Sequence, residues 1–269
     1  MYPLIRFFGN PHDGYLITIH TYKVMLILGV LIGLAYAIYM IKRLGESEER
    51  MIYMTLLSVF FGIIGSRVLY VLYKFNHFLE HPHRILEVGG GGAVFYGGFA
   101  AGLLAAIYYM KRYKLNIRKY LDVIAPASIL GQGIGRLGCY SAGCCYGKPT
   151  SLPWGVVYPA ELRGLTLIPE RYLGVVHLHP TQLYSALGNI IIVLVLTYIL
   201  LRKRRFDGEV FANGLILHSG FYFSMGFLRD ASSQAPSFGP LAVTQIIYIL
   251  ALMLGLYLLF KFKDLSQKG

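Results

Sequence analysis

Long apolar segments separated by short polar ones recur along the 269 residues of the chain. A run of about 20 apolar residues is long enough to cross the hydrocarbon core of a bilayer as one helix. The pattern predicts seven such spans, of which the third, fourth and sixth are short or rich in glycine and polar groups. The expected ranges are 19–41, 51–73, 93–110, 120–139, 183–201, 210–228 and 241–260. The predicted fold class is an all-α polytopic membrane protein with about seven transmembrane helices.

Composition agrees with this class. Hydrophobic residues make up 56% of the chain and charged residues only 14%, whereas a soluble globular protein carries about 25% charged residues. Mean hydropathy is +0.56. The segment Met1–Asp13 lacks the basic start and apolar run of a cleavable signal peptide, so we expect the first span to act as an uncleaved anchor.

The net charge of +12 would suit a nucleic-acid partner, but its distribution argues against one. Basic residues gather in alternate loops, after the first, third, fifth and seventh spans. The positive-inside rule then places the N-terminus outside and the C-terminus in the cytoplasm. The loop and tail positions are Lys42, Arg43, Arg50, Lys111, Arg112, Lys114, Arg118, Lys119, Arg202, Lys203, Arg204, Arg205, Lys261, Lys263 and Lys268.

The chain is expected to form a single integral-membrane domain over residues 1–269. The connections predicted to lie inside are short and basic, whereas residues 140–182 form a long connection on the outer face. Long connections in compact proteins usually carry function. We therefore expect a small head region, about 140–182, above the helices.

The stretch Gly135–Gly147 places an arginine at the outer edge of the fourth span and follows it with all three cysteines of the protein. A charge at a membrane edge is a functional-site hypothesis by default. The planar guanidinium of Arg136 suits two oxygens of a lipid phosphate. The alternative is an interfacial arginine whose head group reaches the water layer.

Cys139, Cys144 and Cys145 are predicted to face the oxidising side of the membrane. An odd number leaves at least one thiol outside any intramolecular disulfide. The thiols could be packing residues, a nucleophile or redox pair, or partners in a disulfide. Zinc with one of the histidines at 77, 81 and 83 is a further possibility, but Cys-x4-Cys-Cys is not a recognised structural zinc pattern. We expect no bound metal and no cofactor.

Two further arginines are candidates. Arg229 ends the sixth span and is followed at once by Asp230, which allows a local ion pair or an interfacial anchor. Arg67 lies within the second span, where a buried arginine needs a partner. Asp122 begins the fourth span on the cytoplasmic side. We expect it to be structural and do not pair it with Arg67.

The segment His179–Tyr184 precedes the fifth span, with Pro180 suited to a first helical turn. His179 and Gln182 belong either to a capping motif or to the site. Tyr22, Tyr96 and Tyr222 are three of 22 tyrosines, most of which should lie in the interfacial aromatic belt.

Taken in order, the motifs resemble the bacterial prolipoprotein diacylglyceryl transferase family. The resemblance runs from about residue 19 to the end of the seventh span. Its elements are Ile19–Met25, Gly65–Tyr70, Phe95–Gly98, Asp122–Pro126, Gly135–Gly138, Leu152–Val156 and His179–Tyr184.

The resemblance implies a reaction: the diacylglyceryl group of phosphatidylglycerol is transferred to the lipobox cysteine thiol of a prolipoprotein, and glycerol phosphate is released. It implies a multi-pass protein of the bacterial cytoplasmic (inner) membrane. Such a reaction needs arginines for the anionic headgroup and a base for the thiol proton. The expected catalytic residues are Arg136, Tyr96, His218, Cys144 and Cys145. The expected substrate-binding residues are Tyr22, Arg67, Gly97, Gly98, Cys139, His179, Gln182, Tyr222 and Arg229.

Several positions depart from the family pattern. Tyr96 stands where the family has a histidine, and Ser185 where it has a glutamate. Family asparagine, asparagine-glycine and glutamate positions hold Cys139, Ala142-Gly143 and Cys144. In the sixth span, His218 aligns with a tyrosine and Tyr222 with an arginine. An unperturbed tyrosine, with a pKa near 10, is a poor base at neutral pH. His218 or a thiolate is expected to compensate.

The sequence is also compatible with two other functions. The same scaffold could carry a thiol-dependent transferase or oxidoreductase that uses Cys144 or Cys145 on another lipid-like substrate. It could also be a lipid-binding or maturation protein without catalytic activity.

Overall fold

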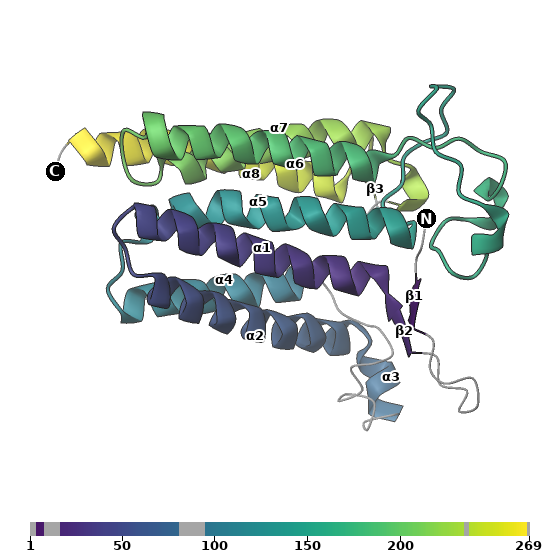
Figure 1. Ribbon diagram of the computed structural model, residues 1–269, viewed down its shortest axis with the longest axis horizontal. Helices are drawn as coiled ribbons and strands as arrows, with labels where there is room; N and C mark the ends of the chain where they lie inside the picture. The colour runs from purple at the N-terminus through teal and green to yellow at the C-terminus, as the bar shows by residue number, and fades with distance from the viewer. Residues whose placement is uncertain (1–3, 8–16, 81–94, 234–236, 268–269) are drawn as a thin grey trace. The chain divides into compact units, whose positions relative to one another are not determined.

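The structure, a computed structural model, describes residues 4–7, 17–80, 95–233 and 237–267 (Figure 1). Each predicted span coincides with one long helix of this part of the chain. These helices are α1 (Thr21–Arg43), α2 (Glu48–Tyr73), α4 (Phe95–Arg112), α5 (Ile117–Ala142), α6 (Thr181–Tyr198), α7 (Glu209–Leu228) and α8 (Val243–Gln267). A π-helical turn, Ile199–Lys203, continues α6. The all-α membrane class is confirmed.

Short elements complete the described chain. Strand β1 (Leu4–Phe7) pairs antiparallel with β2 (Ile17–His20), and β3 (Ser237–Phe238) pairs with β4 (Leu241–Ala242). Helix α3 (Phe75–Glu80) follows α2 directly. The histidines at 81 and 83 lie outside the described residues, as does the side chain of the histidine at 77.

Among the described residues, four helices are long and apolar enough to cross a membrane by length and composition: α1, α2, α6 with its π-helical turn, and α8. The other three long helices, α4, α5 and α7, are those whose spans the sequence pattern marked as short or rich in polar groups. Helix α5 carries Gln132 and Arg136, and α7 carries His218. In α5 and α7, polar side chains that build the site described below contribute to the lower hydropathy.

The chain divides into two compact units. Unit 1 comprises residues 1–36 and 121–269, and unit 2 comprises residues 37–120. Unit 1 contains most of α1 and α5, all of α6, α7 and α8, and the connection between α5 and α6. Unit 2 contains α2, α3 and α4 with the turns that flank them.

In unit 2, glycines allow α2 and α4 to approach closely. A Cβ added to Gly65 would lie 2.6 Å from the carbonyl oxygen of Gly97, and one added to Gly98 would lie 2.9 Å from that of Gly62. Small residues at such crossings let helix backbones pack directly in a membrane. Gly97 and Gly98 thus have a packing role in addition to the substrate role that the sequence predicts for them.

Unit 1 is built in the same way. A Cβ added to Gly29 of α1 would lie 2.6 Å from the carbonyl oxygen of Gly131 in α5. Near the C-terminal end of α5, a Cβ on Gly138 would lie 3.2 Å from the Cα atom of Tyr22. The first turn of α1 therefore lies against the last turns of α5.

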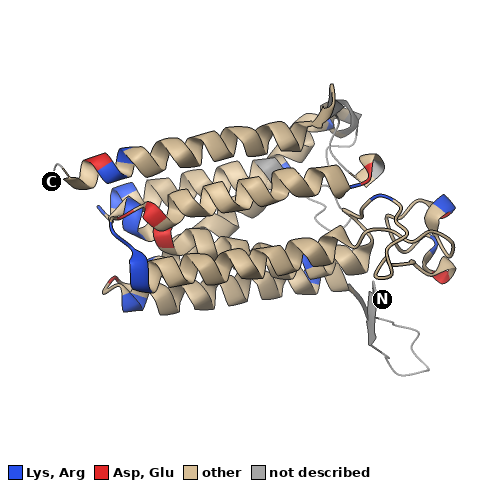
Figure 2. Ribbon diagram, turned by 90° about the horizontal axis from the view of Figure 1, so that it is seen from above, with Lys and Arg blue, Asp and Glu red and all other residues tan. Residues whose placement is uncertain are grey.

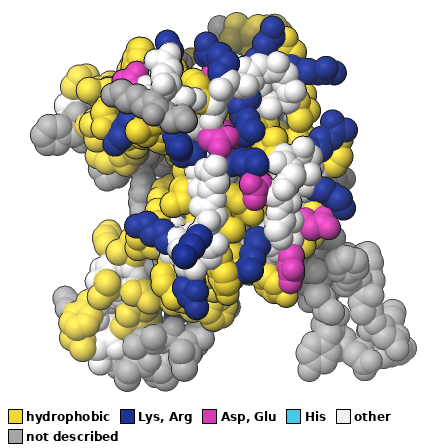
Figure 3. Space-filling view, turned by 90° about the vertical axis from the view of Figure 1, so that its left-hand side faces the viewer, with side chains coloured by type: hydrophobic (Ala, Val, Ile, Leu, Met, Phe, Trp, Pro, Cys, Tyr) yellow, Lys and Arg dark blue, Asp and Glu magenta, His cyan; other side chains and the backbone are white. Residues whose placement is uncertain are grey.

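Charged residues gather at helix ends and in turns (Figure 2). In unit 2, the basic turns adjoin one another: Lys119 pairs with Glu46 at 2.9 Å, and the Arg50 guanidinium carbon lies 4.2 Å from the centre of the Tyr113 ring. In unit 1, Arg205 pairs with Glu209 between α6 and α7. Lys and Arg side chains are prominent on the face drawn in Figure 3.

The Asp122 carboxylate caps the N-terminus of α7. Its carboxylate is fully buried and accepts hydrogen bonds from the backbone N–H groups of Gly208 (2.8 Å) and Phe211 (2.9 Å). Arg204 lies 3.7 Å from the same carboxylate. A negative group at a helix N-terminus satisfies donors that have no partner within the helix. The expectation that Asp122 is structural agrees with this geometry.

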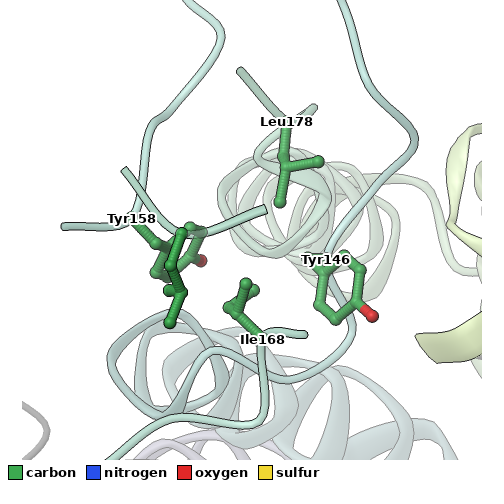
Figure 4. Close-up of a cluster of buried hydrophobic side chains, with 5 residues drawn as sticks. Tyr146, Tyr158, Ile168 and Leu178 are labelled. Carbon is green, nitrogen blue, oxygen red and sulfur yellow. The ribbon is translucent and has the colours of Figure 1, made fainter. Parts of the chain in front are cut away.

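Between α5 and α6, the chain forms a head region with its own apolar cluster. Tyr146, Tyr158, Ile168 and Leu178 point toward one another (Figure 4), and Leu173 completes the cluster. Short 3-10 turns, Ala160–Leu162 and Glu170–Tyr172, interrupt the connection. Backbone bridges join Leu178 to Pro149 and to Val156. The predicted outer connection, residues 140–182, therefore folds as a packed layer.

Replacing Asp122 with alanine is expected to lower the free energy of unfolding by about 3 kcal/mol, because the α7 donors and Arg204 lose a buried charged acceptor. Thermal and denaturant unfolding in detergent micelles measure this change. The matched control is Asp207→Ala, which removes a partly exposed partner of the same Arg204 and should cost less than about 1 kcal/mol. Equal effects of the two variants would contradict the capping role.

Candidate functional site

Helix α5 ends in a turn that brings its last residues back over the helix. Gly143 has a φ of +67°. The N–H of Gly143 donates to the carbonyl of Tyr140, and the N–H of Cys144 donates to the carbonyl of Cys139 at 3.1 Å. These bonds are those of a Schellman motif, in which the residue after the glycine contacts the residue five positions earlier. In this chain, both contacting residues are cysteines, Cys139 and Cys144.

Cys145 completes the cluster. Its φ of +56° is uncommon for a residue with a side chain, and such a conformation persists only where its surroundings hold it. The three sulfur atoms all lie within 4.8 Å of one another, and each cysteine is partly buried. The thiols are free in the structure. We call Cys139, Cys144 and Cys145 the thiol cluster.

Side chains at the start of α6 bind the backbone carbonyls of Cys144 and Cys145. The Thr181 hydroxyl donates to the carbonyl of Cys145 at 2.6 Å, and the Gln182 amide donates to that of Cys144 at 2.8 Å. The same amide also donates to the Tyr158 hydroxyl at 3.1 Å, which ties the turn to the head cluster. Gln182 is buried, so these bonds are protected from water. Gln182 therefore positions the thiol cluster.

Backbone pairing places Arg229 beside the segment that follows the thiol cluster. The N–H of Lys148 donates to the carbonyl of Leu228 at 2.9 Å, and the N–H of Asp230 donates to that of Tyr146 at 3.2 Å. These bonds form an antiparallel bridge between Gly147 and Arg229. The end of α7 is thereby fixed beside the segment that begins at Cys145.

Two arginines face one tyrosine ring. The guanidinium carbon of Arg136 lies 5.2 Å from the centre of the Tyr222 ring, and that of Arg229 lies 5.7 Å from it. Tyr222 is almost fully buried. An aromatic face attracts a cation and does so more strongly where water is excluded. The ring thus holds two positive charges in one region of unit 1.

A hydrogen-bonded layer lies behind Tyr222. Asn189 of α6 donates to the Tyr222 oxygen at 3.2 Å and to the Gln132 side-chain oxygen at 3.1 Å. The Nε2 atom of His218 lies 2.6 Å from the same Gln132 oxygen and acts as the donor, because that oxygen can only accept. The His218 ring lies 4.4 Å from the Tyr222 ring, centre to centre. These contacts fix the orientation of Tyr222.

Arg136 and Arg229 interact electrostatically with the thiol cluster. Hydrogen bonds from the Cys139 and Cys144 thiols lower the pKa of the Cys145 thiol, and the charges of Arg136 and Arg229 lower it further. Burial lowers the pKa of Arg229, and Arg136 adds to this effect. None of the ion pairs formed by the described residues includes Arg136. The region therefore carries excess positive charge and suits an anion.

Most of the predicted site residues of unit 1 lie together. Tyr22 is 39% exposed and lies close enough to the three thiols and Arg136 for their charges to interact. With it lie Arg136, Cys139, Cys144, Cys145, His218, Tyr222 and Arg229. The carbonyl of His179 accepts a hydrogen bond from the N–H of Gly147 at 3.0 Å, and its ring faces Tyr184, whose hydroxyl lies 3.4 Å from His179 Nδ1.

The remaining predicted residues belong to unit 2. The Arg67 guanidinium carbon lies 5.6 Å from the centres of the Tyr70 and Phe78 rings, which gives this charge an aromatic environment within its own unit. Gly97 and Gly98 line the α2–α4 crossing. The side chain of Tyr96 lies outside the described residues.

Sequence reasoning missed Gln132 and Asn189. Each is an amide within an apolar helix, and polar residues at such positions are rare unless they have partners or a function. That signal was present in the sequence. Tyr158 and Thr181 were also missed, and no local pattern distinguishes them from the other tyrosines and threonines.

Comparison with known proteins identifies the family. The family model described as "Prolipoprotein diacylglyceryl transferase" matches residues 15–261. A phosphatidylglycerol–prolipoprotein diacylglyceryl transferase of Clostridium tetani is 31% identical over 239 residues, which cover 89% of this chain and 91% of the relative. A protein of the same name from Finegoldia magna is 30% identical over 247 residues, covering 92% of each chain.

A third relative, from Clostridium botulinum (strain Langeland), has the same name and is 32% identical over 250 residues, covering 93% of this chain and 94% of its own. The family model's range, residues 15–261, runs from before α1 into α8, and the thiol cluster and both arginines lie within it. The chain therefore belongs to the prolipoprotein diacylglyceryl transferase family.

Proposed function

We propose that this protein transfers the diacylglyceryl group of phosphatidylglycerol to the lipobox cysteine thiol of prolipoproteins. The observation that carries the proposal is the pair of guanidinium groups of Arg136 and Arg229 on the buried ring of Tyr222. Phosphatidylglycerol has one anionic phosphate diester, and guanidinium groups bind phosphate oxygens through parallel N–H bonds.

The same arginines would act in the chemical step. As the bond between the glyceryl carbon and the phosphate oxygen breaks, the departing glycerol phosphate gains negative charge. Donors already aimed at that oxygen stabilise the transition state more than the ground state. In a site of low dielectric constant, this contribution is larger than in water.

The location of the site suits a lipid donor. Arg136 lies within the last two turns of α5, and Arg229 directly follows α7, so both lie near the C-terminal ends of their helices. We place this end in the outer leaflet of the bacterial cytoplasmic membrane, with the N-terminus outside and the C-terminus in the cytoplasm. The basic turns at the opposite helix ends support this orientation.

The acceptor thiol must lose its proton to attack carbon. His218 or a thiolate is the expected base, and the Nε2 atom of His218 donates to Gln132 while its ring lies against Tyr222. These contacts give His218 a positioning role in the anion site. The thiol cluster also lies next to the arginines and could activate the acceptor thiol.

Replacing Arg136 or Arg229 with alanine should lower the rate of transfer about 100- to 1,000-fold, because each removes a donor to the departing phosphate. The assay follows labelled diacylglyceryl transfer from phosphatidylglycerol vesicles to a lipobox peptide. The control is Arg163→Ala, an exposed head arginine, which should retain activity within about twofold. Failure of the wild-type protein to transfer, in a preparation where a conventional relative is active, would disprove the function.

The Tyr222 ring, not its hydroxyl group, should matter most. Tyr222→Leu removes two cation–π contacts of about 0.5–2 kcal/mol each and should lower transfer at least about tenfold. Tyr222→Phe retains the ring and loses the hydroxyl that accepts from Asn189 and contacts Arg136, so its activity should fall less than in the leucine variant, by no more than about tenfold. A larger loss in the phenylalanine variant would assign the hydroxyl a direct role. Thermal unfolding of both variants checks that the fold is kept.

A further inference from the structure

We propose that Cys139, Cys144 and Cys145 bind one zinc ion and leave its fourth position open for the acceptor thiol. The inference rests on the proposed transferase function for its chemistry. It differs from the expectation, drawn from sequence spacing alone, that the protein binds no metal.

The geometry fits such an ion. Zinc–sulfur bonds of about 2.3 Å in a tetrahedron place the sulfur atoms about 3.8 Å apart. The three sulfur atoms already lie within 4.8 Å of one another, so each needs to move by less than about 1 Å. The thiols are partly exposed and project from a helix end and a turn, where side-chain rotation can supply this movement.

The turn that gathers the thiols is held from several directions. The Schellman motif places Cys144 over Cys139, and Thr181 and Gln182 bind the backbone carbonyls of Cys145 and Cys144, respectively. Cys145 has a left-handed backbone conformation that residues with a side chain rarely adopt. An observed conformation of this kind supports a functional constraint at that residue.

Charge balance also favours a metal at this position. Three thiolates and one Zn²⁺ carry a net charge of −1, which would rise to −2 when an acceptor thiolate binds. Arg136 and Arg229 supply two positive charges close enough to interact with Cys145. Thiolate ligands and a cysteine-rich tetrahedral arrangement are typical of zinc among the common divalent metals.

Three protein ligands and one open position are the arrangement of catalytic zinc sites. The acceptor cysteine would bind at the open position as a thiolate and release its proton to water, since a thiol that coordinates zinc is deprotonated. The metal then does what a general base would otherwise do. The adjoining arginines place the donor phosphate next to the same position.

The transfer step balances. A sulfur lone pair of the acceptor forms a bond to the terminal glyceryl carbon of the diacylglyceryl group. The bond from that carbon to the phosphate oxygen breaks, and its electron pair leaves with glycerol phosphate, which gains the negative charge that offsets the released proton. The product sulfur is a neutral thioether and a weak ligand, so it leaves the metal and the open position is restored.

The same chemistry argues against Cys144 or Cys145 as a covalent intermediate. If either thiol attacked the glyceryl carbon itself, the product would be a thioether on the enzyme. Covalent catalysis requires an intermediate that reacts further more easily than the substrate. A thioether is a far poorer leaving group than a phosphate, so such an enzyme would stop after one turnover.

The first test measures metal in the full-length protein purified in detergent without chelators. Elemental analysis by inductively coupled plasma mass spectrometry should find about one zinc per chain. Each of the variants Cys139→Ser, Cys144→Ser and Cys145→Ser should lose more than about 80% of that zinc. His177→Asn, at an exposed head histidine, is the matched control and should retain zinc. Metal-free wild-type protein that still has three titratable thiols, or an intact mass lower by two hydrogens that indicates a disulfide, would overturn the proposal.

A second test needs no variant and does not depend on turnover. Wild-type protein in which cobalt replaces zinc should show thiolate-to-cobalt charge-transfer absorption, which should increase when a lipobox peptide is added. The same peptide with serine in place of its cysteine should leave the spectrum unchanged. An equal response to both peptides would contradict an open position for the acceptor.

The two proposals fail in distinguishable ways. Removal of zinc by a chelator should lower transfer at least about tenfold, and added zinc should restore it. Full transfer by metal-free protein would overturn the zinc site and leave the transferase function intact. Zinc binding with the cobalt response but without transfer from phosphatidylglycerol would overturn the function and leave the metal site.

Discussion

The arginine pair on the Tyr222 ring is the constraint around which unit 1 is arranged. Arg136 and Arg229 carry like charges within an apolar bundle, and a buried charge needs compensation. The ring supplies part of it at 5.2 and 5.7 Å. Asn189, Gln132 and His218 hold the ring from behind. The two positive charges make the region suited to an anionic group.

The head region serves this arrangement directly. Its first segment pairs with the end of α7 and sets the position of Arg229. Its apolar cluster includes Tyr158, which shares the Gln182 amide with the Cys144 carbonyl. A single buried amide thus connects the packing of the head to the geometry of the thiols. This explains why a connection of this length is ordered as a layer.

Several of the positions at which the sequence is expected to depart from the family pattern lie at this site. They are Cys139 and Cys144, expected at amide and carboxylate positions, and Tyr222, expected at an arginine position. The structure places these substitutions together, with the thiol cluster, both arginines and Tyr222 in one region. The two arginines are consistent with a retained phosphate site. The cysteines beside them are consistent with a different way of activating the acceptor thiol.

The sequence alone determined α1, α2, α6 and α8, because long apolar runs have few alternatives to a helix in a bilayer. It also predicted the less apolar helices α4, α5 and α7. It also indicated Arg136 and the cysteines as a site. It did not reveal that Cys139 and Cys144 meet, because that contact depends on the turn after α5. It could not bring Arg229 to Arg136, since 92 intervening residues separate them. Pairing between distant segments and packing around Tyr222 decided those contacts, and neither leaves a periodic signal in the sequence.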